Sequence, residues 1–237
     1  MRKVATLGFL LVLLFTPLST SLSTSVAAQQ PAASQPAVQP QGQQGLTDAM
    51  VQTAAIEVPR LVDILQLKPG MAIADVGAGF GAWTVAFGKW IGPSGRVYAT
   101  DIGEKQLAFL KQSTAQAGLT NVTVIAGAER ATNLPVNCCD AILIRDAFHH
   151  FTQPNDFLRS VAASLKPGGR LALIDFPPRP KTEVPAGVPA NRLGHGVPMD
   201  VVVSEMTAAG LTHVSSEPKW SEKSQPNDLF LVVFRKP

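Results

Sequence analysis

The chain has 237 residues, of which 46% are hydrophobic, and a formal net charge of +3. This length allows one domain of ordinary size, or at most two small ones, with a sizeable core. A leader ending at Ala28 would remove Arg2 and Lys3 but no acidic residue, leaving a formal charge of +1. So weak a charge gives no sign of a nucleic-acid surface, and no nucleic-acid partner is expected.

The first 28 residues have the pattern of a secretory signal peptide. Arg2 and Lys3 precede an apolar run over residues 7–15, and small residues at 26–28 suit a cleavage site. Pro17 interrupts the run before it is long enough to span a bilayer comfortably. We therefore predict a signal peptide over 1–28, an exported (periplasmic or secreted) protein and no stable membrane insertion after cleavage. An uncleaved leader would instead leave the protein tethered to a membrane.

Residues 29–45 are rich in Gln, Pro and Ala and show no apolar periodicity, which predicts a disordered linker. The folded domain is expected over residues 46–237. Within its first segment, 46–65, apolar residues recur at three- and four-residue steps with Pro59 as an interruption. This spacing predicts one or two helices.

The central motif lies at residues 73–81, where an apolar run contains Asp75 and leads into Gly77, Gly79 and Gly81. It predicts a strand, a tight turn and a helix N-terminus. Glycine permits positive φ angles and lets a ligand approach without meeting a Cβ, and a helix N-terminus offers free N–H groups. The motif therefore predicts a small-molecule cradle, in which Asp75 would hold the loop or meet a cationic part of the ligand.

Strands and helices are expected to alternate along the chain. Strands are predicted at residues 71–76, 97–100, 122–126, 141–144 and 171–174, with helices after the first, second and fourth. A Pro-rich excursion over 177–198, a helix over 200–209 and two extended runs over 211–217 and 229–234 complete the chain. The alternation predicts an α/β doubly wound, mostly parallel sheet whose ligands bind beyond the carboxyl ends of the strands.

Asp101 closes the second predicted strand, 20 residues after Gly81. A carboxylate at that place is suited to accept two hydrogen bonds from ribose hydroxyls, so Asp101 is predicted to bind a nucleotide sugar. The glycine pattern alone also satisfies a dinucleotide fingerprint, which keeps an NAD-dependent oxidoreductase as an alternative. The early acid, the third glycine and the two terminal extended runs argue against a nicotinamide half-domain.

Four stretches in order, residues 75–81, 98–101, 140–151 and 165–170, resemble the successive motifs of class I S-adenosylmethionine-dependent methyltransferases. The subgroup looks closest to small-molecule methyltransferases of the quinone-biosynthesis type, and the resemblance covers about 46–237. It implies a Rossmann-like seven-stranded sheet of order 3-2-1-4-5-7-6 with the last strand antiparallel. It also implies S-adenosyl-L-methionine as cofactor and methyl transfer to a small-molecule acceptor, an activity of the EC 2.1.1 type.

The resemblance also implies roles for individual residues. Gly77, Gly79 and Gly81 would face the methionine and ribose portions of the donor, and Asp101 would face the ribose hydroxyls. Asp75 keeps the role predicted for it above. Ile102 would cover the adenine face, and Ala128 and Glu129 would flank the adenine after the third strand. Arg145, after the fourth strand, would lie near the methyl-donor end.

Methyl transfer from a sulfonium is an in-line displacement in which positioning can do most of the work. A general base is needed only if the nucleophile holds its proton. His149 and His150 are the titratable pair expected near the crevice, and one of them is predicted as a base or substrate contact. His195, on the excursion that could cover the site, is predicted to contact substrate. A packing or hydrogen-bonding role is the alternative for each.

Cys138 and Cys139 have no partner spacing for zinc, and no metal site is predicted. A bridge between them is not expected, because adjacent cysteines rarely reach disulfide geometry without strain. Because the donor is a cytosolic metabolite while the leader points outward, a non-catalytic ligand-binding or interaction protein on a methyltransferase scaffold is a further alternative. The sequence indicates neither the acceptor nor the oligomeric state.

Overall fold

The computed structural model describes residues 45–179, 182–220 and 228–237. The predicted signal peptide and nearly all of the predicted linker, up to residue 44, lie outside these ranges. Among the described residues, no helix combines the length and hydrophobicity that crossing a bilayer requires.

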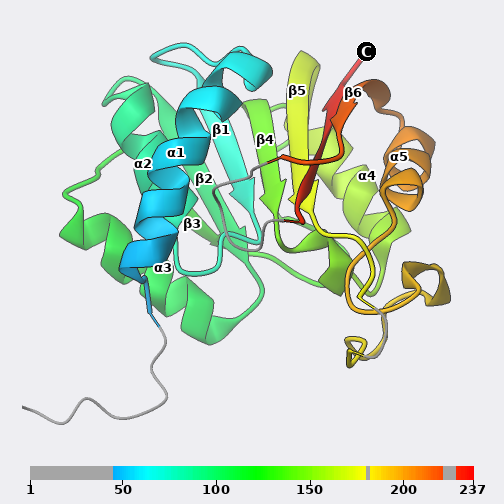
Figure 1. Cartoon of the computed structure of the whole chain (residues 1–237). Helices are drawn as coiled ribbons and strands as arrows, with labels where there is room; N and C mark the ends of the chain where they lie inside the picture. Colours follow the sequence, from blue (N-terminus) through cyan, green and yellow to red (C-terminus); the bar gives the residue numbers. More distant parts are fainter. Residues whose placement is uncertain (1–44, 180–181, 221–227) are drawn as a thin grey trace, which may run out of the picture. The chain divides into compact units, whose positions relative to one another are not determined.

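A seven-stranded sheet of order β3-β2-β1-β4-β5-β7-β6 forms the centre of the domain (Figure 1). Its strands are β1 (Ala72–Val76), β2 (Arg96–Asp101), β3 (Val122–Ala126), β4 (Cys139–Arg145), β5 (Leu165–Asp175), β6 (Thr212–Glu217) and β7 (Phe230–Arg235). The strands from β3 to β5 pair in parallel, whereas β7 runs antiparallel to both β5 and β6. The predicted fold, with its strand order and antiparallel last strand, is confirmed.

In the described part of the chain, five α-helices cover the two faces of the sheet. They are α1 (Asp48–Leu65), α2 (Ala82–Ile91), α3 (Glu104–Gln116), α4 (Pro154–Ser164) and α5 (Met199–Ala208), and two short 3-10 helices, η1 (Phe148–His150) and η2 (Ala190–Arg192), lie in the connections. α1 and α2 pack into one apolar core and α4 and α5 into another, on the opposite face. Helices of the two groups flank the sheet in Figure 1.

The central strand β4 shows why the sheet is covered on both faces. Ile142 and Ile144 are buried in the core under α4 and α5, whereas Ala141 and Leu143 are buried in the core under α1 and α2. Successive side chains of a strand point to opposite faces, so a continuous apolar run is what a doubly covered parallel strand requires.

The segment before β1 forms a single helix, α1, with Pro59 inside it. A proline in a helix interior removes a hydrogen bond and costs about 3 kcal/mol. The helix nevertheless continues because Val58, Leu61, Val62 and Leu65 are buried against the core, and each such burial contributes about 1.5–3 kcal/mol. Packing therefore outweighs the interruption.

Two features, one at the start of β4 and one at the start of β5, differ from the sequence predictions. The sulfurs of Cys138 and Cys139 are bonded to each other, so the expectation of no bridge is wrong. The pairing register with β5 shifts between Cys139 and Ala141, so the backbone at the bridge departs from the regular strand geometry that the expectation assumed. β5 also begins at Leu165 instead of residue 171, because Gly168 and Gly169 exchange backbone hydrogen bonds with Lys236 after β7.

Thiol titration tests the bridge directly. The denatured full chain should show no free thiol without reductant and two after reduction, because Cys138 and Cys139 are its only cysteines. Adjacent residues close too short a loop to restrict the unfolded chain much, so reduction should change the free energy of unfolding by less than about 1 kcal/mol. Two free thiols in the unreduced protein would contradict the bonded pair.

Candidate functional site

The glycine bend between β1 and α2 is left-handed at all three glycines, with φ of +72° at Gly77, +54° at Gly79 and +90° at Gly81. A Cβ added to Gly77 would lie 2.6 Å from the Cβ of Ala147, and one added to Gly81 would lie 2.8 Å from Ser113 Oγ. A Cβ on Gly79 would meet no described atom within 4 Å. Gly77 and Gly81 therefore allow close packing, and Gly79 faces open space.

Asp101, at the end of β2, is joined to this bend. Its Oδ2 accepts a hydrogen bond from the Gly79 N–H at 2.9 Å, and its Oδ1 accepts one from the Gly103 N–H at 3.0 Å. A carboxylate offers about four acceptor positions, so two remain for other donors. The structure thus brings Asp101, the residue predicted to bind the sugar, together with the glycine bend predicted to cradle the ligand.

A cavity of about 490 Å³ opens beside Asp101, within the range of roughly 300–1,000 Å³ of small-molecule sites. On the β2 and β3 side it is lined by Asp101, Ile102, Ala128 and Glu129, four of the residues predicted for the donor. Ile102 is 62% exposed and so offers an apolar surface to a ligand. On the β4 side, the lining includes Asp146, Ala147, His150, Phe151 and Phe157.

A second cavity, of about 310 Å³, lies on the other side of the glycine bend, under the start of α1. Its lining includes Asp75, Gly81, Trp83 and Arg145, and it shares Gly77, Gly79 and Asp146 with the first cavity. The bend therefore borders both cavities, and an elongated ligand could lie across it.

Asp75 is buried in β1, and its Oδ2 accepts a hydrogen bond from Thr84 Oγ1 at 2.6 Å. Burial raises the pKa of the Asp75 carboxyl to about 6; the Asp101 charge also raises this pKa, while the Thr84 hydrogen bond and the Arg145 charge lower it. A ligand cation next to Asp75 would therefore displace a proton that is held at mildly acidic pH.

Arg145, predicted near the methyl-donor end, is engaged in a buried ion pair. Its Nε donates to Glu57 Oε2 at 2.8 Å and its Nη2 to Glu57 Oε1 at 3.2 Å, while its guanidinium lies 3.9 Å over the Trp83 ring. Trp83 Nε1 also donates to Glu57 Oε2, at 2.9 Å. The three side chains hold α1 over the end of β4. Glu57 gave no signal in the sequence because its partner lies 88 residues away.

The three predicted histidines lie together. The His149 ring centroid lies 4.0 Å from that of His150 and 5.0 Å from that of His195. His149 is buried, and its Nδ1 lies 2.8 Å from Oδ1 of Asp175, a buried residue at the end of β5 that the sequence did not single out. Of the adjacent pair, His150 lines the larger cavity. Partial desolvation by the surrounding protein is the main cause that lowers the pKa of the His150 imidazole to about 4; the neighbouring His149 and His195 contribute to the lowering and Asp175 opposes it, so the ring is neutral at pH 7.

Asp146 follows Arg145 and lines both cavities, although no role was predicted for it. It adopts a φ of +53°, and its N–H donates to the Ile174 carbonyl at 2.8 Å. Although the residue is exposed to the cavity, desolvation by the surrounding protein raises the pKa of its carboxyl; the Asp175 charge also raises this pKa, while nearby positive charges such as Arg145 lower it. A strained acidic residue at a cavity wall is a frequent feature of functional sites.

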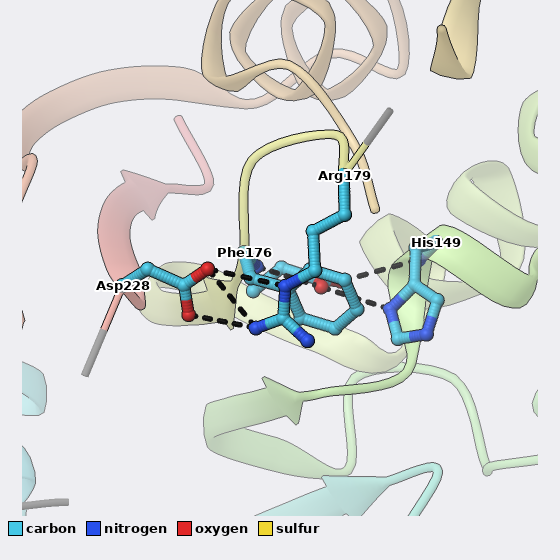
Figure 2. Close-up of polar contacts among 5 residues, drawn as sticks. His149, Phe176, Arg179 and Asp228 are labelled. Carbon is cyan, nitrogen blue, oxygen red and sulfur yellow. Dashed lines mark hydrogen bonds and ion pairs between the residues drawn. The ribbon is translucent and has the colours of Figure 1, made fainter. Parts of the chain in front are cut away.

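The excursion after β5 is anchored near the histidines. Figure 2 shows the Arg179 guanidinium over the Phe176 ring and paired with Asp228, with His149 beside that ring. Arg179 Nη2 donates to both Asp228 oxygens, at 2.7 and 3.0 Å, and Arg179 Cζ lies 4.1 Å from the Phe176 ring centroid. The backbone of Arg179 also bonds to the His195 carbonyl, at 2.9 Å, which places His195 at this anchor.

The sequence matches known methyltransferases. Residues 73–169 match a family model described as a methyltransferase domain. The ubiquinone/menaquinone biosynthesis C-methyltransferase of Bordetella parapertussis is 32% identical over 120 residues, a match that covers 51% of this chain and 46% of that protein. The chain thus matches about half the length of this curated relative.

The fold matches solved structures over a larger part of the chain. A SAM dependent methyltransferase from Aquifex aeolicus is 26% identical with a TM-score of 0.61, covering 76% of this chain and 89% of that one. The phosphoethanolamine N-methyltransferase 2 of Haemonchus contortus, solved with S-adenosyl-L-methionine, has a TM-score of 0.61 at 14% identity and covers 77% of this chain and 52% of that one. The latter likeness shows the fold alone.

The strand order, the glycine bend and these matches together support a domain of the class I S-adenosylmethionine-dependent methyltransferase type. Within that class, its sequence is similar to the C-methyltransferases of quinone biosynthesis, and the resemblance found in the motifs is confirmed.

S-adenosyl-L-methionine, the cofactor of this class, fits the residues present. Asp101 keeps free acceptor positions, Gly79 leaves open space, and the two cavities meet at the bend. Asp75, in the second cavity, supplies a buried carboxylate for a positive charge. Contacts of individual residues with the donor remain predictions.

The raised pKa of Asp75 predicts how pH changes stability. The folded-state pKa of about 6 lies above the unfolded value of 3.8, so the folded protein binds more protons between these values and its stability falls as pH rises through them. Asp75→Asn removes the ionisation and keeps an acceptor for Thr84. Urea unfolding should show that the variant is more stable than the wild type at pH 8. This difference in the free energy of unfolding should be larger at pH 8 than at pH 4, by on the order of 2–3 kcal/mol. An equal gain at both values would contradict the buried ionisation, and Asp63→Asn, on the exposed side of α1, controls for loss of an aspartate.

The ion pair of Arg145 predicts a second effect on stability. Glu57→Ala leaves the buried guanidinium without its partner and should lower the free energy of unfolding by about 3–5 kcal/mol. Glu217→Ala removes a carboxylate from an exposed pair with Arg60 and should cost less than about 1 kcal/mol. Denaturant unfolding of the two variants checks the difference, and equal losses would show that the buried pair has no special role.

Proposed function

We propose that the protein transfers the methyl group of S-adenosyl-L-methionine to a small-molecule acceptor by in-line displacement, an activity of the EC 2.1.1 type. The observation that carries the proposal is the hydrogen bond between Asp101 and the Gly79 N–H at the wall of a 490 Å³ cavity. This contact supports the proposal because it joins the Asp101 carboxylate, which we propose binds the sugar, to an open glycine bend at one site.

The chain's own residues position the donor. Asp101 would accept hydrogen bonds from the ribose, and Ile102, Ala128 and Glu129 would surround the adenine. The methionine portion would cross the bend toward Asp75 and the Arg145 end of the second cavity. The donor supplies a sulfonium with a good leaving group, so the protein's task is to hold the two reactants in line and exclude water.

The acceptor would enter from the β4 side of the larger cavity. Phe151, Phe157 and Pro185 make that wall apolar, and His150 contributes a neutral imidazole there. These groups suit an acceptor with a flat apolar ring and a hydroxyl, and the curated relative is named for ubiquinone and menaquinone biosynthesis. We therefore favour a quinol-like acceptor, with His150 as its polar contact and His149 and His195 behind it.

We also propose that residues 1–28 act as a leader and export the domain. The bonded Cys138 and Cys139 support this proposal, because disulfides persist mainly in oxidising compartments. Protease protection of the full chain in intact and permeabilised cells tests it. Digestion only after the inner membrane is opened would place the domain in the cytosol and contradict export.

Calorimetric titration of the full chain tests donor binding. S-adenosyl-L-methionine should bind and NAD should not. Asp101→Ala should weaken donor binding by about 10- to 150-fold, because hydrogen bonds to a charged group contribute about 1.5–3 kcal/mol. Glu104→Ala, an exposed acid three residues away that lines neither cavity, should leave donor affinity unchanged.

The same titration separates the alternatives. Binding of NAD alone would indicate an oxidoreductase, and binding of neither ligand would indicate a non-catalytic scaffold. Where the donor binds, formation of S-adenosylhomocysteine is measured with a panel of hydroquinones. Donor affinity that survives Asp101→Ala would contradict the proposed site.

A further inference from the structure

We propose that His149, His150 and His195 form a binding site for one divalent transition-metal ion, for which zinc is the best fit. The side chains come from two distant segments, η1 after β4 and the excursion after β5. One ring nitrogen from each lies within 4.8 Å of the corresponding nitrogens of the other two. Three imidazoles are a recurring ligand set for zinc sites with an open position.

The spacing is close to that of a bound site. Zn–N bonds of about 2.0–2.1 Å in a tetrahedron separate the ligand nitrogens by about 3.4 Å. The ring nitrogens lie within 4.8 Å of one another, so they need to approach by at most about 1.4 Å. Two of the three rings can make this adjustment. His150 is exposed on a short 3-10 helix, and His195 lies between Gly194 and Gly196, whose φ angles are +144° and +125°.

His149 is held as a metal-binding histidine usually is. Its Nδ1 lies 2.8 Å from Asp175 Oδ1, and a carboxylate can only accept, so the Nδ1 carries the proton and the Nε2 keeps its lone pair. Asp175 is itself fixed by the N–H groups of His149 and Phe176, at 3.1 and 2.9 Å. A carboxylate that sets the tautomer and orientation of a ligating imidazole is the common outer partner in metal sites.

His195 supplies an independent observation. Its Nε2 is buried and has no hydrogen-bond partner among the described residues. A buried polar atom without a partner costs about 1–3 kcal/mol, so such an atom in a folded protein needs an explanation. An ion shared with His149 and His150 would satisfy it.

The local charges favour a cation. Ligand atoms of Asp146, His149 and Asp175 also lie within 4.8 Å of one another, so two carboxylates surround His149. The nearby Arg179 is paired with Asp228 and stacked on the Phe176 ring (Figure 2). The Asp228 carboxylate therefore neutralises the positive charge of Arg179 near the histidines.

His150 also lines the larger cavity, so a position left open on the ion would be reached from that cavity. The ligand there would be an oxygen donor, such as a hydroxyl or phenolate. That such an oxygen belongs to the methyl acceptor rests on the proposed function; the ion site itself does not. A bound ion would replace the bare imidazole of His150 as the polar contact for the acceptor.

The test uses the full chain without a polyhistidine tag, with its cysteines bridged and after removal of metals by chelator. Calorimetric titration with Zn²⁺ should give one ion per chain and a dissociation constant on the order of 1 µM or lower. Co²⁺ should give the visible absorption of a low-symmetry nitrogen site. His150→Ala and His195→Ala should each weaken Zn²⁺ binding at least about tenfold.

The chain contains a matched control. His213→Ala removes the fourth histidine, which lies on β6 and bonds to Ser216 Oγ at 2.9 Å, and it should leave Zn²⁺ affinity unchanged. Asp175→Asn keeps the shape beside His149 but loses the carboxylate, and should weaken Zn²⁺ by about 10- to 100-fold. Circular dichroism confirms that each variant is folded, and Zn²⁺ should raise the Tm of the wild type but not of His195→Ala.

Three results would overturn the metal site. They are a Zn²⁺ dissociation constant weaker than about 0.1 mM, wild-type Zn²⁺ affinity in the His150→Ala and His195→Ala variants, or a loss of Zn²⁺ affinity in His213→Ala as large as theirs. Titration of the same samples with S-adenosyl-L-methionine keeps the two proposals apart. Donor binding without Zn²⁺ binding refutes the metal site alone, and Zn²⁺ binding without donor binding refutes the proposed function alone.

Discussion

The hydrogen bond from the Gly79 N–H to Asp101 is the contact on which the site depends. It joins the turn after β1 to the end of β2, at the edge where parallel strands present their carboxyl ends. The turn can reach Asp101 because Gly77 and Gly81 adopt left-handed φ angles and have no Cβ to meet Ala147 and Ser113. This hydrogen bond and the absence of a Cβ at Gly77 and Gly81 therefore hold the bend in a position where it lines both cavities.

Much of this arrangement could be predicted from local patterns. The apolar runs of β1 to β4 and the glycines between β1 and α2 are read within windows of a few residues, and the structure contains each of them. The position of Asp101 followed from topology, because neighbouring parallel strands end at one edge of a sheet. The order of all seven strands came from the resemblance, since strand order is set by contacts that a local pattern does not contain.

The rest depends on partners that are distant in sequence. Glu57 binds Arg145 from 88 residues away, and Asp175 binds His149 from 26 away. An acidic residue in an amphipathic helix or at a strand end is compatible with exposure, so its burial becomes evident only when the partner is in place. The Cys138 bridge was excluded by a rule for regular backbone, and it occurs where the strand register shifts. The grouping of the histidines likewise needed the fold.

The central claim is that the glycine bend and the Asp101 carboxylate both bind the donor. The most direct measurement is the change in backbone amide NMR shifts when S-adenosyl-L-methionine is added to the isotopically labelled full chain. The account predicts that the largest changes fall on Gly79 and Gly103, whose N–H groups bond to the Asp101 carboxylate. Donor binding that leaves these two amides unchanged and shifts residues elsewhere would contradict it.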